Sequence, residues 1–203
     1  MIQSVQEVIA VRILCFGDSN TYGYDPRDFW ESRYEAENRW TDILEKHTGC
    51  QVINAGSNGR TIPPNPDLLI SHSQYTQVHM ILLMLGTNDL LQGTSAEDTA
   101  AKMEQFLKGL LPCRSRILLI APPPLRRGAW IPSEELIAES IQLAEKYSLL
   151  AHHLGIPFLD TRNWNIELAF DGVHFSEAGH RTFARNLHKE LRQNHWWQSG
   201  LYE

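Results

Sequence analysis

What this 203-residue sequence lacks already excludes several classes of protein. It has no basic excess, because 18 Lys and Arg residues stand against 24 Asp and Glu residues. The net charge of −6 argues against a nucleic-acid-binding protein, which usually carries a basic face. No apolar run approaches the roughly 20 residues that a membrane span needs, and the longest are 80–85 and 117–121. We therefore expect neither a nucleic-acid partner nor a membrane-spanning segment.

Cysteine is also scarce. The three cysteines, Cys15, Cys50 and Cys113, are odd in number and lack CxxC spacing, so we expect neither a disulfide framework nor a zinc ribbon. No spacing of His, Cys and Asp resembles a zinc site, and we predict no metal or other cofactor. The first residues include Glu7 and no early cluster of positive charge, which predicts no secretory signal. A reducing, cytoplasmic location fits these features.

The length and the composition, with 42% hydrophobic and 21% charged residues, are those of one globular domain covering residues 1–203. Short apolar runs alternate with amphipathic stretches, which predicts buried strands separated by helices. The predicted strands are 9–16, 51–54, 78–85, 115–121 and 156–160. This alternation predicts an α/β fold with a parallel sheet covered by helices on both faces. For the fold class, our hypothesis is a three-layer flavodoxin-like sandwich with a five-stranded parallel sheet of order 2-1-3-4-5.

Several predicted helices begin at recognisable capping residues. Ser95 and Asp98 resemble a capping box, and apolar residues follow at helical spacing. Ser133 is predicted to cap the longest helix, and the last helix is predicted to begin near Ser176. A shorter helix is predicted over residues 38–47.

Four short polar motifs each follow a predicted strand. They are 17–21 (GDSNT), 54–59 (NAGSNG), 86–89 (GTND) and 171–174 (DGVH), and the last precedes the final helix. Ligands of open α/β sheets bind outside the carboxyl ends of the strands. With strand order 2-1-3, the first three motifs become neighbours at one edge of the sheet, which is where we expect the functional site.

Each motif alone has a simpler interpretation. Ser19 could cap a helix, Gly59 could be a turn glycine, and Asn88 could be a turn or cap residue. Any one of the nine histidines is more often structural or solvated than functional. The prediction depends on the four motifs occurring together in sheet order, which chance rarely supplies.

Together the motifs contain the groups that acyl transfer requires. A serine hydroxyl becomes a good nucleophile only when a base removes its proton, and we predict Ser19 as the nucleophile and His174 as the base. Asp171, three residues before His174, is predicted to orient the imidazole. The Ser19 N–H, the Gly59 N–H and the Asn88 side-chain amide are predicted to form the oxyanion hole.

The G-x-S-x-G elbow of the α/β-hydrolases is absent, because Thr21 occupies the position of its second glycine. The four motifs instead resemble the blocks of the SGNH hydrolases, also called the GDSL family, from Ile13 to about Leu191. This resemblance implies a catalytic triad of Ser19, Asp171 and His174, with Gly59 and Asn88 as oxyanion donors. The fourth residue of the name motif is Asn20 instead of Leu, a variation outside those catalytic groups.

Within the superfamily, the chain is most similar to bacterial arylesterases and to acyltransferase/perhydrolase-type esterases. The matching stretches are 13–19, 39–41, 84–89 and 122–124. This resemblance implies hydrolysis of short-chain aryl or alkyl esters through an acyl-enzyme on Ser19, with acyl transfer to alcohols in some members. Leu90 and Leu91 depart from the polar and basic residues common after the Asn-Asp pair.

Two connections, 24–37 and 122–132, are long for an α/β fold and are predicted to form the rim of the site. Their aromatic residues include Trp30 and Trp130, which we predict as substrate-binding residues together with Leu90 and Leu91. The consecutive prolines 122–124 stiffen one wall, which favours a narrow cleft for a small acyl group. In the alternative interpretation, these aromatics only seal the loops onto the body of the protein.

Three alternatives stay open at this point. A flavodoxin-like nucleotide-binding protein could hold phosphate at the turn 19–23, but this leaves the Asp171–His174 motif unexplained. A catalytically dead scaffold would not need the full set of catalytic residues. Within the superfamily, a carbohydrate deacetylase, a lysophospholipase or a thioesterase would carry the same motifs. Trp196 and Trp197 either cover the core or fill an interface in a homo-oligomer.

Overall fold

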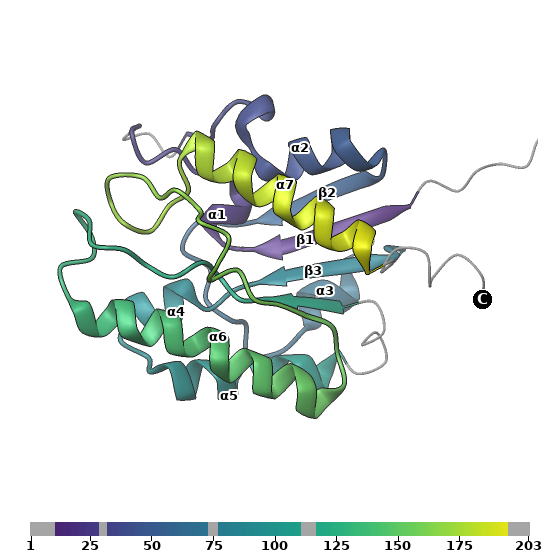
Figure 1. The fold of residues 1–203 in the computed structure, drawn as a ribbon. Helices are drawn as coiled ribbons and strands as arrows, with labels where there is room; N and C mark the ends of the chain where they lie inside the picture. Colours follow the sequence, from purple (N-terminus) through teal and green to yellow (C-terminus); the bar gives the residue numbers. More distant parts are fainter. Residues whose placement is uncertain (1–10, 29–31, 73–76, 111–116, 195–203) are drawn as a thin grey trace, which may run out of the picture.

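The predicted strands form one parallel sheet in the computed structural model, which describes residues 11–28, 32–72, 77–110 and 117–194. Its strands are β1 (Arg12–Gly17), β2 (Gln51–Gly56), β3 (Met80–Met84), β4 (Ile117–Ile120) and β5 (Phe158–Leu159). All neighbouring pairs are parallel and the order is β2-β1-β3-β4-β5, which confirms the predicted order 2-1-3-4-5. Figure 1 shows the sheet between two layers of helices.

Each face of the sheet is covered by its own group of helices (Figure 1). One face is covered by α2 (Trp40–Thr48) and α7 (Glu177–Gln193). The other is covered by α3 (Asp67–Ser71), α4 (Thr87–Leu91), α5 (Ala96–Gly109) and α6 (Glu134–Leu154). Two short elements, α1 (Ser19–Tyr22) and η1 (Ala36–Asn38), lie in the connection between β1 and α2.

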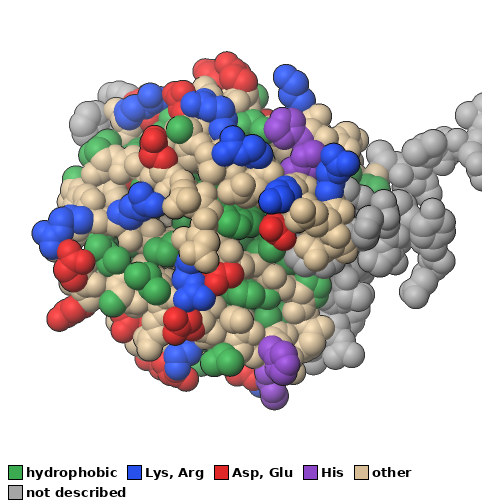
Figure 2. Space-filling view, in the orientation of Figure 1, with side chains coloured by type: hydrophobic (Ala, Val, Ile, Leu, Met, Phe, Trp, Pro, Cys, Tyr) green, Lys and Arg blue, Asp and Glu red, His purple; other side chains and the backbone are tan. Residues whose placement is uncertain are grey.

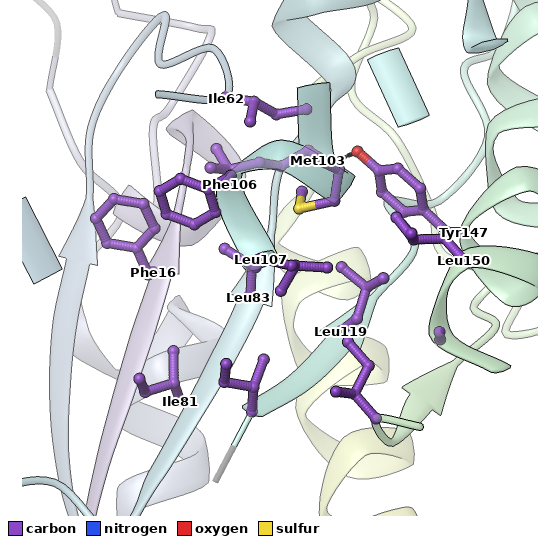
Figure 3. Packing of buried hydrophobic residues seen from close by; sticks show 14 of the residues in the cluster. Phe16, Ile62, Ile81, Leu83, Met103, Phe106, Leu107, Leu119, Tyr147 and Leu150 are labelled. Atoms are coloured by element: carbon purple, nitrogen blue, oxygen red, sulfur yellow. Dashed lines mark hydrogen bonds between the residues drawn. The ribbon is translucent and has the colours of Figure 1, made fainter. Parts of the chain in front are cut away.

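Strand side chains alternate between two hydrophobic clusters, as the period of a β-strand requires. In β1, Leu14 and Phe16 belong to the cluster beneath α5 and α6, whereas Ile13 and Cys15 belong to the cluster beneath α2 and α7. Figure 3 shows the first cluster, in which the ring of Phe16 stacks with that of Phe106. Both faces of the sheet are therefore buried, which explains why the strand sequences are continuously apolar.

The helix caps that the sequence predicts are confirmed. The Ser95 hydroxyl accepts a hydrogen bond from the Asp98 N–H at 3.0 Å, and Ser133 caps α6 by accepting from the Glu135 N–H at 3.1 Å. Ser176 caps α7 in the same way. A hydroxyl at this position satisfies an N–H that the helix itself cannot pair.

The register of the three central strands brings the first three polar motifs to one edge of the sheet. Gly17, the last residue of β1, pairs with Gly56 of β2 on one side and with Met84 of β3 on the other. A Cβ on Gly56 would lie 2.1 Å from the Tyr22 N, so glycine is required for the close approach of β2 to α1. The segment before α7 folds back on itself through a bridge between Leu168 and Phe175, and it reaches this region through hydrogen bonds of Val173 and Phe175 to the Asn20 side chain of α1.

Charged side chains of both signs are interspersed on the face shown in Figure 2. None of the helices in the described part of the chain is long and apolar enough to cross a membrane. Cys15 and Cys50 are free thiols. Cys113, Trp196 and Trp197 lie outside the described residues.

Candidate active site

Ser19 begins α1 directly after β1, at the edge where the polar motifs meet. The preceding residue, Asp18, caps this short helix by accepting a hydrogen bond from the Asn20 N–H at 3.0 Å. The Ser19 side chain is largely buried, and its Oγ lies 3.0 Å from Nε2 of His174. A strand-to-helix turn thus presents a hydroxyl to an imidazole 155 residues away in the sequence.

His174 in turn contacts Asp171 through its other ring nitrogen. The distance from His174 Nδ1 to Asp171 Oδ2 is 2.6 Å, and the second carboxylate oxygen accepts from the backbone N–H groups of Val173 and His174. Burial alone would raise the pKa of Asp171, but these hydrogen bonds outweigh it and lower the pKa. An ionised Asp171 accepts a hydrogen bond from the Nδ1–H group of His174, and in this tautomer Nε2 carries a lone pair that can accept the hydroxyl proton of Ser19.

Two of the three residues predicted to supply oxyanion donors, Gly59 and Asn88, line the same pocket as the third, Ser19, and His174. Gly59 has a φ of +70°, in the left-handed region that favours glycine, and an added Cβ would point into open space. The Asn88 Nδ2 donates one hydrogen bond to the Arg60 carbonyl at 3.1 Å. An amide nitrogen carries two N–H groups, so a second donor of Asn88 is available to a ligand oxygen.

Two further residues, Arg60 and Asp89, fix the segment that carries Gly59. The Arg60 guanidinium donates to the carbonyls of Gly17 and Ala55, at the ends of β1 and β2. Asp89 is fully buried, and its carboxylate accepts from the Ile62 N–H at 3.0 Å and from Lys102 Nζ at 3.1 Å. Neither role was predicted from the sequence, in which the one signal is that each residue directly follows a predicted oxyanion donor.

A pocket of about 250 Å³ lies beside these groups. Its lining residues are Ser19, Tyr24, Asn58, Gly59, Asn88, Leu91, Trp130 and His174. The ring of Tyr24 lies 4.6 Å from the His174 imidazole, and Trp130 meets the same imidazole edge-on at 5.2 Å. The two rings therefore cover the imidazole on the side of the rim, and only 5% of the His174 surface is exposed.

The predicted substrate-binding residues fall into three groups. Leu91 and Trp130 line the pocket. Leu90 does not, because its side chain is 2% exposed and packs in the core beneath α5 and α6. Trp30 lies outside the described residues. Tyr24 and Asn58, which line the pocket, come from the predicted rim loop and the second motif, but neither was expected individually.

Trp130 is held in place by hydrogen bonds between two loops. The N–H groups of Ala129 and Trp130 donate to the carbonyls of Phe170 and Asp171 at 2.9 and 3.1 Å. Gly172 has a φ of +81°, and an added Cβ there would lie 2.1 Å from the Arg126 carbonyl oxygen. The loop after β4 thus packs directly against the turn that carries Asp171 and His174.

A larger cavity of about 540 Å³ lies between α2 and α7. Its lining residues are Ala36, Glu37, Asp42, Ile43, Lys46, His47, Arg181 and Arg185, and they include no serine, threonine or cysteine. Across the described residues, no three His, Cys, Asp or Glu side chains are arranged to hold a metal ion. The smaller pocket is therefore the one that combines a hydroxyl, a base and hydrogen-bond donors.

Solved structures with esterase descriptions match almost the whole chain. The inhibitor-bound aryl esterase of M. smegmatis is 27% identical, with a TM-score of 0.77, and the match covers 91% of this chain and 99% of that one. A carbohydrate acetylesterase family member from Sinorhizobium meliloti is also 27% identical, with a TM-score of 0.74 and coverage of 90% and 98%. Among curated protein sequences, none matches this chain.

The model of the GDSL-like lipase/acylhydrolase family matches residues 15–182. This stretch contains all four polar motifs and runs from β1 into α7. The structural neighbours described above are an aryl esterase and a carbohydrate acetylesterase family member of the SGNH superfamily, and their TM-scores of 0.77 and 0.74 show the same overall fold. The sequence match and the fold agree over most of the molecule, and the chain belongs to the GDSL-like lipase/acylhydrolase family of hydrolases.

Proposed function

We propose that the protein is a serine esterase that hydrolyses short-chain carboxylic esters through an acyl-enzyme on Ser19. The observation that carries this proposal is the continuous chain of contacts from Ser19 Oγ through His174 to Asp171, beside a pocket of about 250 Å³. A hydroxyl, an imidazole and a carboxylate in this order form the arrangement that activates a nucleophile for acyl transfer.

The reaction begins when His174 Nε2 takes the hydroxyl proton of Ser19 and Oγ attacks the ester carbonyl carbon. Charge develops on the carbonyl oxygen, and the N–H groups of Ser19 and Gly59 and the amide of Asn88 stabilise it. Protonated His174 then gives its proton to the departing alkoxide, which leaves as the alcohol. The acyl-enzyme on Ser19 remains for the second half of the reaction.

Water attacks the acyl-enzyme in the second half, again with His174 as the base, and the carboxylic acid is released. An alcohol that enters in place of water accepts the acyl group, and the product is a new ester. Asp171 stabilises the imidazolium in both halves because its lowered pKa keeps it ionised. No step in either half needs a metal or another cofactor.

The pocket size and its walls support a short acyl group. Leu91 packs against Leu125, Ile131 and Val173, and Trp130 is tied to the Asp171 turn by its backbone. Walls that are fixed in this way yield little to a longer chain. The exposed side of Trp130, 52% of whose surface is accessible, offers an apolar face to a flat leaving group.

The test is kcat/KM for p-nitrophenyl esters of increasing acyl length. We expect a maximum at acetate or butyrate and a steep fall by octanoate. Trp130→Ala should extend the accepted chain, whereas Phe170→Ala, which removes an exposed aromatic that does not line the pocket, should not. A maximum at decanoate or longer would contradict the short-chain proposal and favour a lysophospholipase or a long-chain thioesterase.

A second candidate concerns the alcohol part of the ester. The similarity to the carbohydrate acetylesterase family member from Sinorhizobium meliloti favours an acetylated sugar as substrate. The same pocket and the same acyl-enzyme would serve this reaction, because only the leaving group differs. Release of acetate from peracetylated glucose at a kcat/KM above that for p-nitrophenyl acetate would support it, and no release would exclude it.

A further inference from the structure

One buried amide joins the turn that carries Ser19 to the segment that carries His174. Asn20, the residue after Ser19, has only 5% of its surface exposed. Its Nδ2 donates to the Val173 carbonyl at 3.1 Å, and its Oδ1 accepts from the Phe175 N–H at 2.8 Å. The two backbone groups that it binds are those on either side of His174.

The hydrogen bonds of the neighbouring backbone show why an amide is needed there. The N–H groups of Val173 and His174 donate to Asp171, and the His174 carbonyl accepts from the Ala169 N–H at 2.7 Å. The Asn20 side chain pairs the adjoining carbonyl and N–H, which are also buried. A short amide presents a donor and an acceptor side by side, and an unpaired buried group would cost free energy.

Asn20 is itself fixed on the side of the nucleophile. Its N–H donates to the Asp18 carboxylate at 3.0 Å, and its carbonyl accepts from Nε1 of Trp40 at 2.9 Å. The Trp40 side chain is 1% exposed and packs in the cluster beneath α2 and α7. Both the backbone and the side chain of Asn20 are therefore held, so the residue is a rigid link between the two chain segments.

We propose that Asn20 is a positioning residue that sets the distance between Ser19 Oγ and His174 Nε2. This inference rests on the proposed function, in which proton transfer between those two atoms starts the reaction. A leucine, which the family name motif has at this position, would form neither of the side-chain hydrogen bonds. In this chain, the position of the base thus depends on a side chain adjacent to the nucleophile.

The first test is steady-state kinetics of Asn20→Ala with p-nitrophenyl acetate. We expect kcat to fall by ~10–100-fold, because small displacements of reacting groups have effects of this size, with KM nearly unchanged. Asn186→Ala is the matched control, since Asn186 also donates from its amide to a backbone carbonyl, that of Trp164, away from the pocket. The control should keep the wild-type kcat.

A double variant separates positioning from a general loss of structure. If Asn20 acts through His174, adding Asn20→Ala to His174→Ala should cause no further loss of the residual activity. An equal loss in both backgrounds, or a folded Asn20→Ala protein with a kcat within about twofold of wild type, would overturn the proposal. Asn20→Asp has the same shape and keeps the acceptor for Phe175, and it should lose kcat even if Asn20→Ala does not fold.

The rate at which a fluorophosphonate labels Ser19 gives a readout that does not need ester turnover. Asn20→Ala should slow this labelling, and Asn186→Ala should not. If the wild-type protein hydrolyses no ester but its Ser19 is labelled faster than that of Asn20→Ala, the proposed function is refuted and the positioning role is supported. Equal labelling rates in an active enzyme would refute the positioning role alone.

Discussion

The segment before α7 and the first turns of α7 each hold a buried histidine, and the surroundings of the two differ. His174 is 5% exposed and lies between the Asp171 carboxylate and the Ser19 hydroxyl. His180 is fully buried between the rings of Tyr34 and Phe175, each 5.3 Å away. Its Nδ1 accepts a long hydrogen bond of 3.4 Å from the Trp40 N–H, and its Nε2 has no partner among the described residues.

Burial disfavours the charged form of a histidine, so a buried imidazole can act as a base only where polar partners stabilise that charged form. Burial lowers the pKa of His180 to about 3, helped by the positive charges around it, so its imidazole stays neutral over the whole physiological range. His174 is nearly as buried but has a carboxylate to stabilise its charged form and a hydroxyl to supply the proton. The two histidines thus show that partners, and not burial, distinguish a candidate base from a core residue.

The largest expected effect concerns His174, the histidine with polar partners, and the Ser19 hydroxyl that it contacts. Ser19→Ala and His174→Ala should each lower kcat by ~10³-fold or more, and the double variant should be little worse than either single one, because the two groups act as a unit. Steady-state kinetics with p-nitrophenyl acetate measures this. A fluorophosphonate adduct found by mass spectrometry on a residue other than Ser19 would contradict the assignment of the nucleophile.

The next largest effect concerns the Asn88 side-chain amide, a hydrogen-bond donor in the same pocket. Asn88→Ala should reduce kcat by ~10²–10³-fold, or about 2.7–4 kcal/mol, with a smaller change in KM, because its amide acts on the charge of the transition state. Comparing kcat with KM on one ester series measures this difference. If Asn88→Ala instead raises KM and keeps kcat, Asn88 binds the ground state of the substrate and not the oxyanion.

Burial favours the neutral form of Asp18, as it does for His180. It raises the pKa of the Asp18 carboxyl from 3.8 to about 6. The folded protein then binds this proton more tightly than the unfolded chain does, so the Asp18 contribution lowers the free energy of unfolding as pH rises from 3.8 to about 6. At about 1.4 kcal/mol for each pH unit, the total is on the order of 3 kcal/mol.

Asp18→Asn should therefore stabilise the protein at pH 7.5 and have little effect at pH 4, because asparagine caps α1 as well as aspartate does. Urea unfolding of both proteins at a series of pH values gives the difference in the free energy of unfolding. The comparison with wild type cancels the opposite contribution of Asp171, whose pKa is lowered. A difference that does not change with pH would show that the pKa of Asp18 is the same in the folded and the unfolded protein.

The smallest expected effect concerns His180, the histidine packed between aromatic rings. His180→Phe removes a long hydrogen bond and an unpartnered Nε2 and keeps an aromatic ring between Tyr34 and Phe175. We expect kcat within about twofold of wild type and a change in the free energy of unfolding of no more than ~1 kcal/mol. A loss of kcat as large as that of His174→Ala would mean that burial and aromatic contacts do not identify a core histidine here.

Much of the fold and the outline of the site could be predicted from local sequence signals. Ser95, Ser133 and Ser176 cap helices because a hydroxyl satisfies an N–H within the same short segment. Continuous apolar runs mark strands covered on both faces, and their alternation with helices indicates a parallel sheet between two layers of helices. The order 2-1-3-4-5 is a hypothesis about this fold class, and the structure confirms it. The polar motifs follow those strands directly, so their common edge follows from the topology.

The pocket walls and the positioning contacts depend on how distant segments pack. Leu90 and Leu91 are adjacent on α4, but successive helix residues point about 100° apart, so one lies in the core and the other in the pocket. Trp130 meets His174 only because two loops are hydrogen-bonded to each other. Asn20 binds a carbonyl 153 residues away. Local sequence determined the strands, the caps and the chemical groups, and tertiary packing alone decided which side chains those groups face.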